Sequence, residues 1–123
     1  MSDKHHKLNY IELPATDLAA MKTFYSAAFG WRFKDWGDVY VEILDGGIDG
    51  GFDGTGERPS VGEGGALVIL YSDDIDASEA AVTAAGGKIS KPIFQFPGGR
   101  RFHFIDPCGN ELAVWTEIGG GAT

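Results

Sequence analysis

The pattern of hydrophobic and polar positions predicts one strand, one helix and three strands in the first half of the chain. Alternating apolar residues predict a strand at residues 8–14. Apolar residues three and four positions apart then predict a helix over residues 17–29, which Gly30 ends. Further strands are expected at residues 31–36, 39–44 and 48–52.

The same order of elements returns after a glycine-rich loop at residues 53–65. A predicted strand at residues 66–71 leads through an acidic run into a helix that continues to Ala85. The carboxylates of that run suit a helix start, where the backbone N–H groups are free to donate. Three more strands are expected at residues 88–91, 100–105 and 111–116.

The two halves of the chain can therefore be laid over each other. A shift of 57 positions places Asp17 on Asp74 and Gly30 on Gly87, each at one end of a predicted helix. The pattern predicts an α+β fold in which two βαβββ modules make a single domain at residues 1–123. The modules are expected at about residues 8–56 and 65–117, with flexible tails at residues 1–7 and 118–123.

Composition and charge narrow the functions that such a domain can have. The 123 residues include 10 Lys and Arg against 18 Asp and Glu, which gives a net charge of −8. That charge repels a phosphate backbone or an anionic membrane, so neither nucleic acid nor membrane is expected as a partner. The single cysteine, Cys108, can form neither an internal disulfide nor a thiolate metal cage. No apolar run approaches the roughly 20 residues of a membrane span, and we expect a soluble, cytoplasmic protein.

Two motifs far apart in the chain resemble those of a known superfamily. The segment FYSAAFGW at residues 24–31 and the segment DPCGNELAVW at residues 106–115 resemble the vicinal oxygen chelate superfamily. This superfamily includes glyoxalases, bleomycin-resistance and fosfomycin-resistance proteins and extradiol dioxygenases, and the chain looks most similar to small members related to lactoylglutathione lyase. The resemblance implies an open, curved mixed sheet made of two half-barrels with helices on its outer face. It also implies a concave pocket for a small-molecule ligand and a homodimer.

Active members of the superfamily hold a divalent metal that binds two oxygens of the substrate. The resemblance places the metal-binding positions at Tyr10, Leu67, Ala113 and either Gly50 or Gly51. A neutral phenol is a poor ligand for a divalent cation, and the other side chains offer no ligating atom. We therefore expect a pocket with neither the usual metal nor a cofactor.

Side chains alternate across a strand, so position parity indicates which residues share a face with those positions. In fosfomycin-resistance members, the pocket is lined three and five residues before the Asp of the DP turn. The resemblance therefore assigns His103 and Arg101 to the pocket, and the internal repeat assigns Glu42 and Tyr40. The expected lining is Tyr10, Glu12, Tyr40, Glu42, Leu67, Ile69, Arg101, His103, Ala113 and Trp115.

Three functions remain open for these residues. The first is a metal-independent binding protein for an aromatic or amphipathic small molecule, in which Arg101 is suited to hold a ligand carboxylate or phosphate. The second is an enzyme of the lyase or isomerase kind, which transfers a proton on a small carbonyl compound with Glu12 and His103 as the catalytic acid–base pair. The third is a relocated metal site made by Glu12, Glu42 and His103. In the plainest alternative, Glu12, Glu42 and Arg101 only neutralise one another in a wet cavity, and the sequence leaves open whether the protein is an enzyme.

Overall fold

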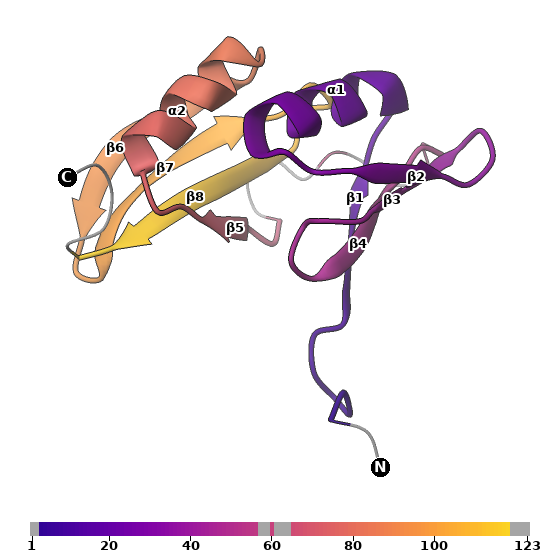
Figure 1. Ribbon diagram of the computed structural model, residues 1–123, viewed down its shortest axis with the longest axis horizontal. Coiled ribbons are helices and arrows are strands. Elements are labelled where there is room, and N and C mark those ends of the chain that lie inside the picture. The colour runs from indigo at the N-terminus through magenta and orange to yellow at the C-terminus, as the bar shows by residue number, and fades with distance from the viewer. Residues whose placement is uncertain (1–2, 57–59, 61–64, 119–123) are drawn as a thin grey trace.

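The computed structural model describes residues 3–56, 60 and 65–118, and its elements follow the order βαβββ twice (Figure 1). Module one consists of β1 (Tyr10–Pro14), α1 (Leu18–Phe29), β2 (Phe33–Asp35), β3 (Tyr40–Ile43) and β4 (Asp49–Asp53). Module two consists of β5 (Val68–Tyr71), α2 (Ile75–Ala84), β6 (Lys88–Phe96), β7 (Gly99–Ile105) and β8 (Glu111–Glu117). Parts of the predicted loop and tails, at residues 1–2, 57–59, 61–64 and 119–123, lie outside the described residues.

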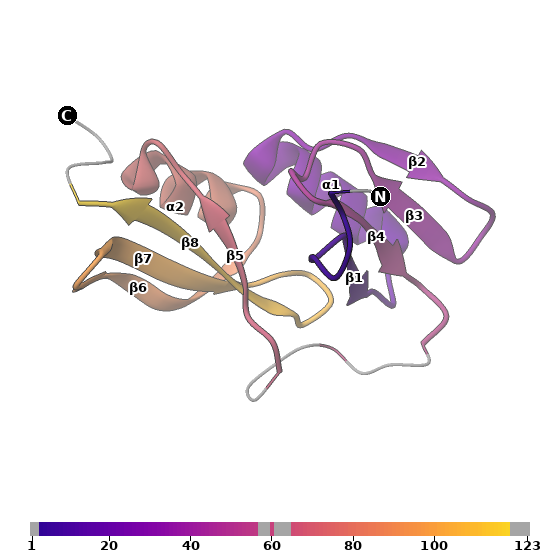
Figure 2. The same ribbon diagram turned by 90° about the horizontal axis from the view of Figure 1, so that it is seen from below.

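Each module forms its own mixed sheet of four strands within the described part of the chain. The strand order is β1-β4-β3-β2 in module one and β5-β8-β7-β6 in module two. The first strand of each module pairs in parallel with the last, and the other neighbours pair antiparallel. The two sheets lie side by side, and both helices cover the same side of them (Figure 1 and Figure 2). The expected α+β class, with helices on the outer face of open sheets, is confirmed.

Both helices start at aspartates that the 57-residue shift makes equivalent. Asp17 Oδ1 accepts a hydrogen bond from the backbone N–H of Ala20 at 3.0 Å, and Asp74 Oδ1 accepts one from Ala77 at 3.1 Å. In each case the carboxylate satisfies a backbone donor that has no partner inside the helix. No helix in the described ranges is long and apolar enough to cross a membrane.

The glycines after the two helices have different roles. Gly30 ends α1 with a φ of 74°, and Gly86 follows α2 with a φ of 96°, so both adopt the left-handed backbone that favours glycine. Gly87 is the residue that the shift predicts, but its role is close packing. A Cβ at Gly87 would lie 2.7 Å from both the Phe24 ring and Val82 Cγ1. This glycine therefore lets the end of α2 approach α1 of the other module.

The core lies between the helices and one face of both sheets, and it spans the two modules. Phe24 of α1 and Phe104 of β7 have ring centroids 5.8 Å apart, so aromatic packing joins the modules. Other buried members are Leu13, Met21, Tyr25, Val41, Phe52, Ile75, Val82, Phe102, Leu112 and Val114. Burying a side chain of this size contributes roughly 1.5–3 kcal/mol to folding.

The predicted end of β6 at Lys91 is wrong, because the strand continues to Phe96. Pro92 lacks a backbone N–H, which argues against a central strand, but β6 is the edge strand of its sheet. Its pairing with β7 shifts register on both sides of Lys91. The longer strand places Phe94 and Phe96 beside β7, which bears directly on the site below. The other predicted strand bounds differ from the structure by one or two residues.

Candidate functional site

The candidate site lies on the open faces of the two sheets, which are the faces turned away from the helices. In module one, Leu13 and Val41 are buried in the core, so the alternating residues on β1 and β3 point to the open face. These residues are Tyr10, Glu12, Tyr40 and Glu42. In module two the open face carries Leu67, Ile69, Arg101, His103, Ala113 and Trp115. The ten residues predicted to line one pocket are thus divided between two sheets.

Two phenols share a short hydrogen bond on the open face of module one. The hydroxyl oxygens of Tyr10 and Tyr40 lie 2.5 Å apart, and Tyr40 also hydrogen-bonds with Glu12. Gly51 makes room for this arrangement, because a Cβ there would overlap the Tyr40 hydroxyl. Burial is the main cause that raises the Tyr40 pKa, and the hydrogen bonds to Tyr10 and Glu12 add to it. Tyr40 is therefore a neutral phenol at physiological pH.

Glu42 has a partner on its own module that the sequence reasoning missed. The indole N–H of Trp36 donates a hydrogen bond to Glu42 Oε1 at 2.8 Å. Lys34, which pairs with Glu42 across β2 and β3, places its Nζ 4.3 Å from the Trp36 ring centroid. The Lys34, Trp36 and Glu42 side chains thus form one polar and aromatic cluster at the far edge of this sheet.

On module two, His103 is oriented by a carboxylate. His103 Nδ1 lies 3.0 Å from Glu111 Oε2, and an ionised carboxylate can only accept, so Nδ1 carries the proton. In the neutral imidazole, Nε2 is then the acceptor. His103 is 4% exposed, and Nε2 has no hydrogen-bond partner within the described residues. Glu111 was missing from the predicted lining, although its two-residue spacing from Ala113 placed it on the same face.

Arg101 lies on the same face of β7, two residues before His103. Its Cζ is 5.5 Å from the ring centroid of Phe94 and 5.6 Å from that of Phe96. Trp115 pairs with Arg101 across β7 and β8, and its ring contacts that of Tyr71 with centroids 5.2 Å apart. The open face of module two is therefore aromatic around one guanidinium.

The structure places the two residues of the predicted acid–base pair on different sheets. Glu12 lies on the sheet of module one beside Tyr40, whereas His103 lies on the sheet of module two and contacts Glu111. The predicted trio of Glu12, Glu42 and His103 is divided in the same way. Within the described ranges there is no group of three or more His, Cys, Asp and Glu side chains that could hold a metal ion. Position parity defines the face of each strand but does not say which sheets come together.

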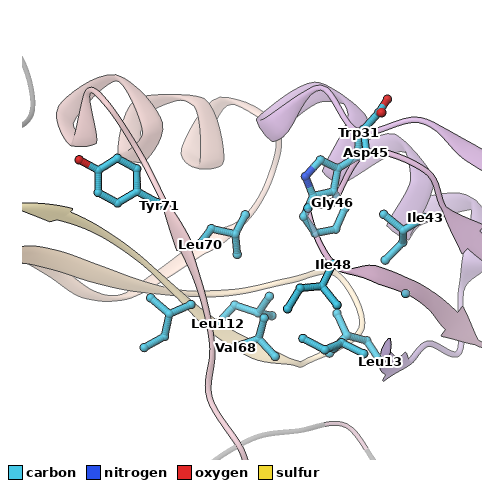
Figure 3. A pocket seen from close by; sticks show the side chains of 14 residues that line it. Leu13, Trp31, Ile43, Asp45, Gly46, Ile48, Val68, Leu70, Tyr71 and Leu112 are labelled. Carbon is cyan, nitrogen blue, oxygen red and sulfur yellow. The ribbon is translucent and has the colours of Figure 1, made fainter. Parts of the chain in front are cut away.

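A separate pocket of about 440 Å³ lies between the two modules. Figure 3 shows side chains of β5 and β8 on one side of it and side chains of module one on the other. Several of its lining residues also belong to the core or pack against it, among them Leu13, Ile43, Val68, Leu70 and Leu112. Ile69 is the residue that this lining shares with the predicted one. Ile69 and Tyr71 also belong to the open face of module two, so this apolar pocket adjoins that face.

Comparison with known proteins identifies the family. A model described as the Glyoxalase/Bleomycin resistance protein/Dioxygenase superfamily matches residues 7–114. The chain belongs to this superfamily. A glyoxylase-like domain-containing protein from Didymella fabae is 31% identical over 133 residues, which cover 94% of this chain and 97% of that protein.

Two mycobacterial relatives in this glyoxalase superfamily are longer than the chain. The proteins named "Putative glyoxylase CFP32" in Mycobacterium bovis and Mycobacterium tuberculosis are 31% identical over 117 residues, and these cover 87% of this chain. The match covers 44% of the mycobacterial proteins, so the chain spans less than half of their length.

Solved structures of the superfamily share the fold. A glyoxalase/bleomycin resistance protein/dioxygenase family enzyme from Burkholderia phytofirmans has a TM-score of 0.75 at 17% identity, over 89% of this chain and 98% of that chain. A lactoylglutathione lyase from Agrobacterium tumefaciens has a TM-score of 0.69 at 21% identity, over 90% and 93%. At these identities the likeness shows the fold alone.

The residues that the resemblance assigns to the metal-binding positions do not form a convergent set of ligands for a divalent cation. In module one, the space above Gly51 is filled by Tyr40, whose hydroxyl is hydrogen-bonded to Tyr10. In module two, the corresponding positions are Leu67 and Ala113, which have no ligating atom. Side chains that bind divalent cations are mostly convergent carboxylates, imidazoles and thiolates. A neutral phenol pair and two apolar side chains do not provide them.

Proposed function

We propose that this protein binds a small organic molecule on the open face of module two. The observation that carries the proposal is the pair of polar side chains, Arg101 and His103, whose buried Nε and Nε2 atoms lack hydrogen-bond partners among the described residues. They are set among Phe94, Phe96 and Trp115. Small-molecule sites are usually of this kind, with mainly apolar surroundings and a few polar groups that fix the ligand.

A thermal-shift screen with aromatic and amphipathic compounds tests this proposal. A ligand that binds the folded state raises Tm in a way that depends on its concentration. We expect at least one compound to do so, and His103→Gln to weaken that effect. Lys34→Gln, on the open face of the other module, serves as the control and should leave the effect unchanged. If every compound leaves Tm unchanged, the proposal is wrong.

We further propose that binding needs no divalent metal. The chemistry at Tyr10, Gly51, Leu67 and Ala113 supports this, because no carboxylate, imidazole or thiolate stands at these positions. Calorimetric titration of the metal-stripped protein with Zn²⁺, Ni²⁺ and Mn²⁺ is the measurement. We expect no stoichiometric uptake, and a ligand effect on Tm that is the same with and without EDTA. Stoichiometric binding of any of the three ions contradicts the proposal.

A second copy of the chain is the partner that we propose for the open faces. Leu67, Ile69 and Tyr71 are 37%, 44% and 47% exposed, and β5 is an edge strand in the described sheet. Exposed apolar groups of this kind mark an interaction surface. We expect the mass from light scattering to be that of a dimer, and Ile69→Glu to yield monomers. Val39→Glu, which changes an equally exposed residue on module one, is the control and should not alter the mass. A monomeric wild type contradicts the proposal.

Proton transfer on a small carbonyl compound is a second candidate function, and the orientation of His103 favours it. Glu111 holds Nδ1–H, so the neutral imidazole presents Nε2 as a proton acceptor. In this arrangement Glu111, and not Glu12, is the residue that positions the base. Exchange of the carbon-bound protons of dihydroxyacetone in D₂O, followed by ¹H NMR, is the test. We expect His103→Gln to abolish exchange, Glu111→Gln to reduce it, and Glu12→Gln to leave it unchanged. Exchange no faster than in buffer alone contradicts this function.

A further inference from the structure

Arg101 differs from Arg32 and Arg100 in having no carboxylate partner among the residues that the structure describes. Arg100, the preceding residue, pairs with Asp76 at 3.6 Å, and Arg32 pairs with Asp45 at 2.5 Å. For Arg101 the structure records contacts with two aromatic rings, and its buried Nε has no hydrogen-bond partner in the described part of the chain. Among the described residues, the half-buried guanidinium of Arg101 thus has no carboxylate partner.

The surroundings of Arg101 determine what can pair with it. Removing a cation from water is costly unless acceptors replace the lost hydration. The rings of Phe94 and Phe96 attract the guanidinium through cation–π contacts, but a ring offers no in-plane acceptor to the N–H groups. The planar fork of N–H donors matches the two oxygens of a carboxylate. The N–H groups of Arg101 therefore still require an acceptor, and an anion that lies in the plane of the guanidinium provides it.

The neighbouring side chains favour a flat apolar body on that anion. Trp115 pairs with Arg101 across β7 and β8, and its ring lies 6.4 Å from that of Phe96 and 5.2 Å from that of Tyr71. Aromatic groups pack on one another in offset or edge-to-face geometry at such distances. Ala113, two residues before Trp115 on the same face, is fully buried, whereas Trp115 is half-buried. The ring of a ligand can therefore pack against Trp115.

His103 supplies a second polar contact on the same face. The Phe94 ring that stacks on Arg101 also lies 6.0 Å from the His103 ring, so both polar groups border one aromatic side chain. His103 Nε2 is buried and unpartnered among the described residues, while Nδ1 is held by Glu111. Two polar groups two residues apart on one strand therefore border the same part of the open face.

The carboxylates on this face limit the charge of the ligand. Glu111 borders His103, and Glu117 accepts a hydrogen bond from the Tyr71 hydroxyl at 2.9 Å beside Trp115. Both remain close to the polar groups and repel a second negative charge. A carboxylate, with one negative charge, therefore suits the site better than a phosphate, which carries up to two.

We propose that Arg101 binds the carboxylate of a small aromatic acid whose ring packs against Trp115. This inference names the ligand class of the site described under Proposed function and rests on that function. The probes are 2-naphthoate, its neutral amide 2-naphthamide, and 2-naphthyl phosphate, which share one ring system. Binding is measured by NMR titration of the Trp115 indole and of the β7 amides. We expect 2-naphthoate to bind at least about tenfold more tightly than the amide, as for a charge-assisted hydrogen-bonded pair.

Substitutions on neighbouring positions of β7 supply the matched control. Arg101→Gln should reduce the affinity for 2-naphthoate to that for the amide, and Arg101→Lys, which keeps the charge but loses the fork, should remove most of the preference. Arg100→Gln makes the same charge change on the opposite side of the strand and should have no effect. The inference is overturned if the acid and the amide bind equally, or if Arg101→Gln leaves the affinity for 2-naphthoate unchanged. Either result leaves the small-molecule function in place. Tighter binding of the phosphate overturns the choice of carboxylate. If none of the probes binds, the inference is wrong, and the thermal-shift screen decides separately on the function.

Discussion

The Tyr25 hydroxyl donates a hydrogen bond to Asp106 Oδ2 at 2.8 Å, and both side chains are buried. Asp106 Oδ1 accepts from the backbone N–H groups of Cys108 and Asn110 at 2.9 and 3.0 Å, so neutral donors surround the carboxylate. The Asn110 side chain also donates to the Pro14 carbonyl at 2.8 Å. The two motifs that resembled the superfamily thus meet in space, and together they tie α1 and β1 to the turn between β7 and β8.

We expect Tyr25→Phe to lower the free energy of unfolding by about 1.5–3 kcal/mol, because a hydrogen bond to a buried charged group is lost. Urea unfolding followed by circular dichroism measures the change. Tyr71→Phe removes a phenol–carboxylate bond to Glu117 at the surface and is the matched control, with an expected cost under about 1 kcal/mol. Equal costs for the two variants would contradict this assignment.

The Asp106 carboxyl should make stability fall as the pH rises. Burial raises its pKa, although the hydrogen bonds from Asn110, Tyr25 and Cys108 act against that rise. A carboxyl with a higher pKa in the folded protein holds its proton more tightly when folded. Its stabilising contribution is therefore fully present below the unfolded pKa of about 3.9 and is lost as the pH rises through the folded pKa. Carboxyl ¹³C NMR measures the midpoint, which we expect above that of the exposed aspartates.

Tyr25→Phe also tests the cause of this pH dependence. Its hydrogen bond is one of those that lower the Asp106 pKa, so the pKa should rise further in the variant. The difference in unfolding free energy between wild type and variant should then grow with pH across that window. A difference that is constant with pH would show that the bond does not depend on the charge of Asp106.

The two helix caps should contribute equally. Asp17→Ala and Asp74→Ala each remove one side-chain acceptor at a helix start, and each should cost about 1 kcal/mol in urea unfolding. Because the two caps share no partner in the described structure, the double variant should cost about the sum. Asp17→Asn and Asp74→Asn keep a capping oxygen and should restore most of the loss. An unaffected single variant would show that the cap at that helix is dispensable.

Adjacent glycines on β4 should respond differently to alanine. A Cβ at Gly50 would lie 2.5 Å from the Ile11 carbonyl oxygen, so Gly50→Ala must move backbone and should cost on the order of 1–3 kcal/mol. A Cβ at Gly51 would meet the far end of the Tyr40 side chain, which can swing away. We therefore expect Gly51→Ala to cost less in urea unfolding. It should also lower the Tyr40 pKa towards its ordinary value in a spectroscopic phenol titration, and an unchanged titration would contradict the role of Gly51.

Most of the fold could be predicted because its signals are local. Helical spacing, the capping aspartates and the order of elements each depend on a few neighbouring residues, and the structure agrees with them. The extension of β6 past Pro92 could not be predicted, because it depends on β6 lying at a sheet edge. Edge position is a property of the whole sheet and has no signal in the sequence of one strand.

The candidate site could be predicted only in part. The resemblance assigned Arg101 and His103 to the pocket, and parity along β8 added Trp115. The pairing of β7 with β8 places the three on one face. The carboxylate that contacts His103 could not be identified in this way. Glu12 and Glu111 have equally suitable parity, and the choice between them depends on the register of β7 against β8 and on the separation of the two sheets.

The hydrogen bonds at the turn between β7 and β8 also affect how quickly the chain can fold. Tyr25 and Asp106 are 81 residues apart in the chain, and Asn110 and Pro14 are 96 residues apart. Contacts of such high contact order slow folding, because a long loop must close before they form. Each sheet can assemble from shorter loops, so we expect the two modules to join late in folding. A fragment that ends before Asp106 would keep the phenol of Tyr25 without its acceptor and would leave Phe24 without the ring of Phe104 that it contacts once the turn is closed.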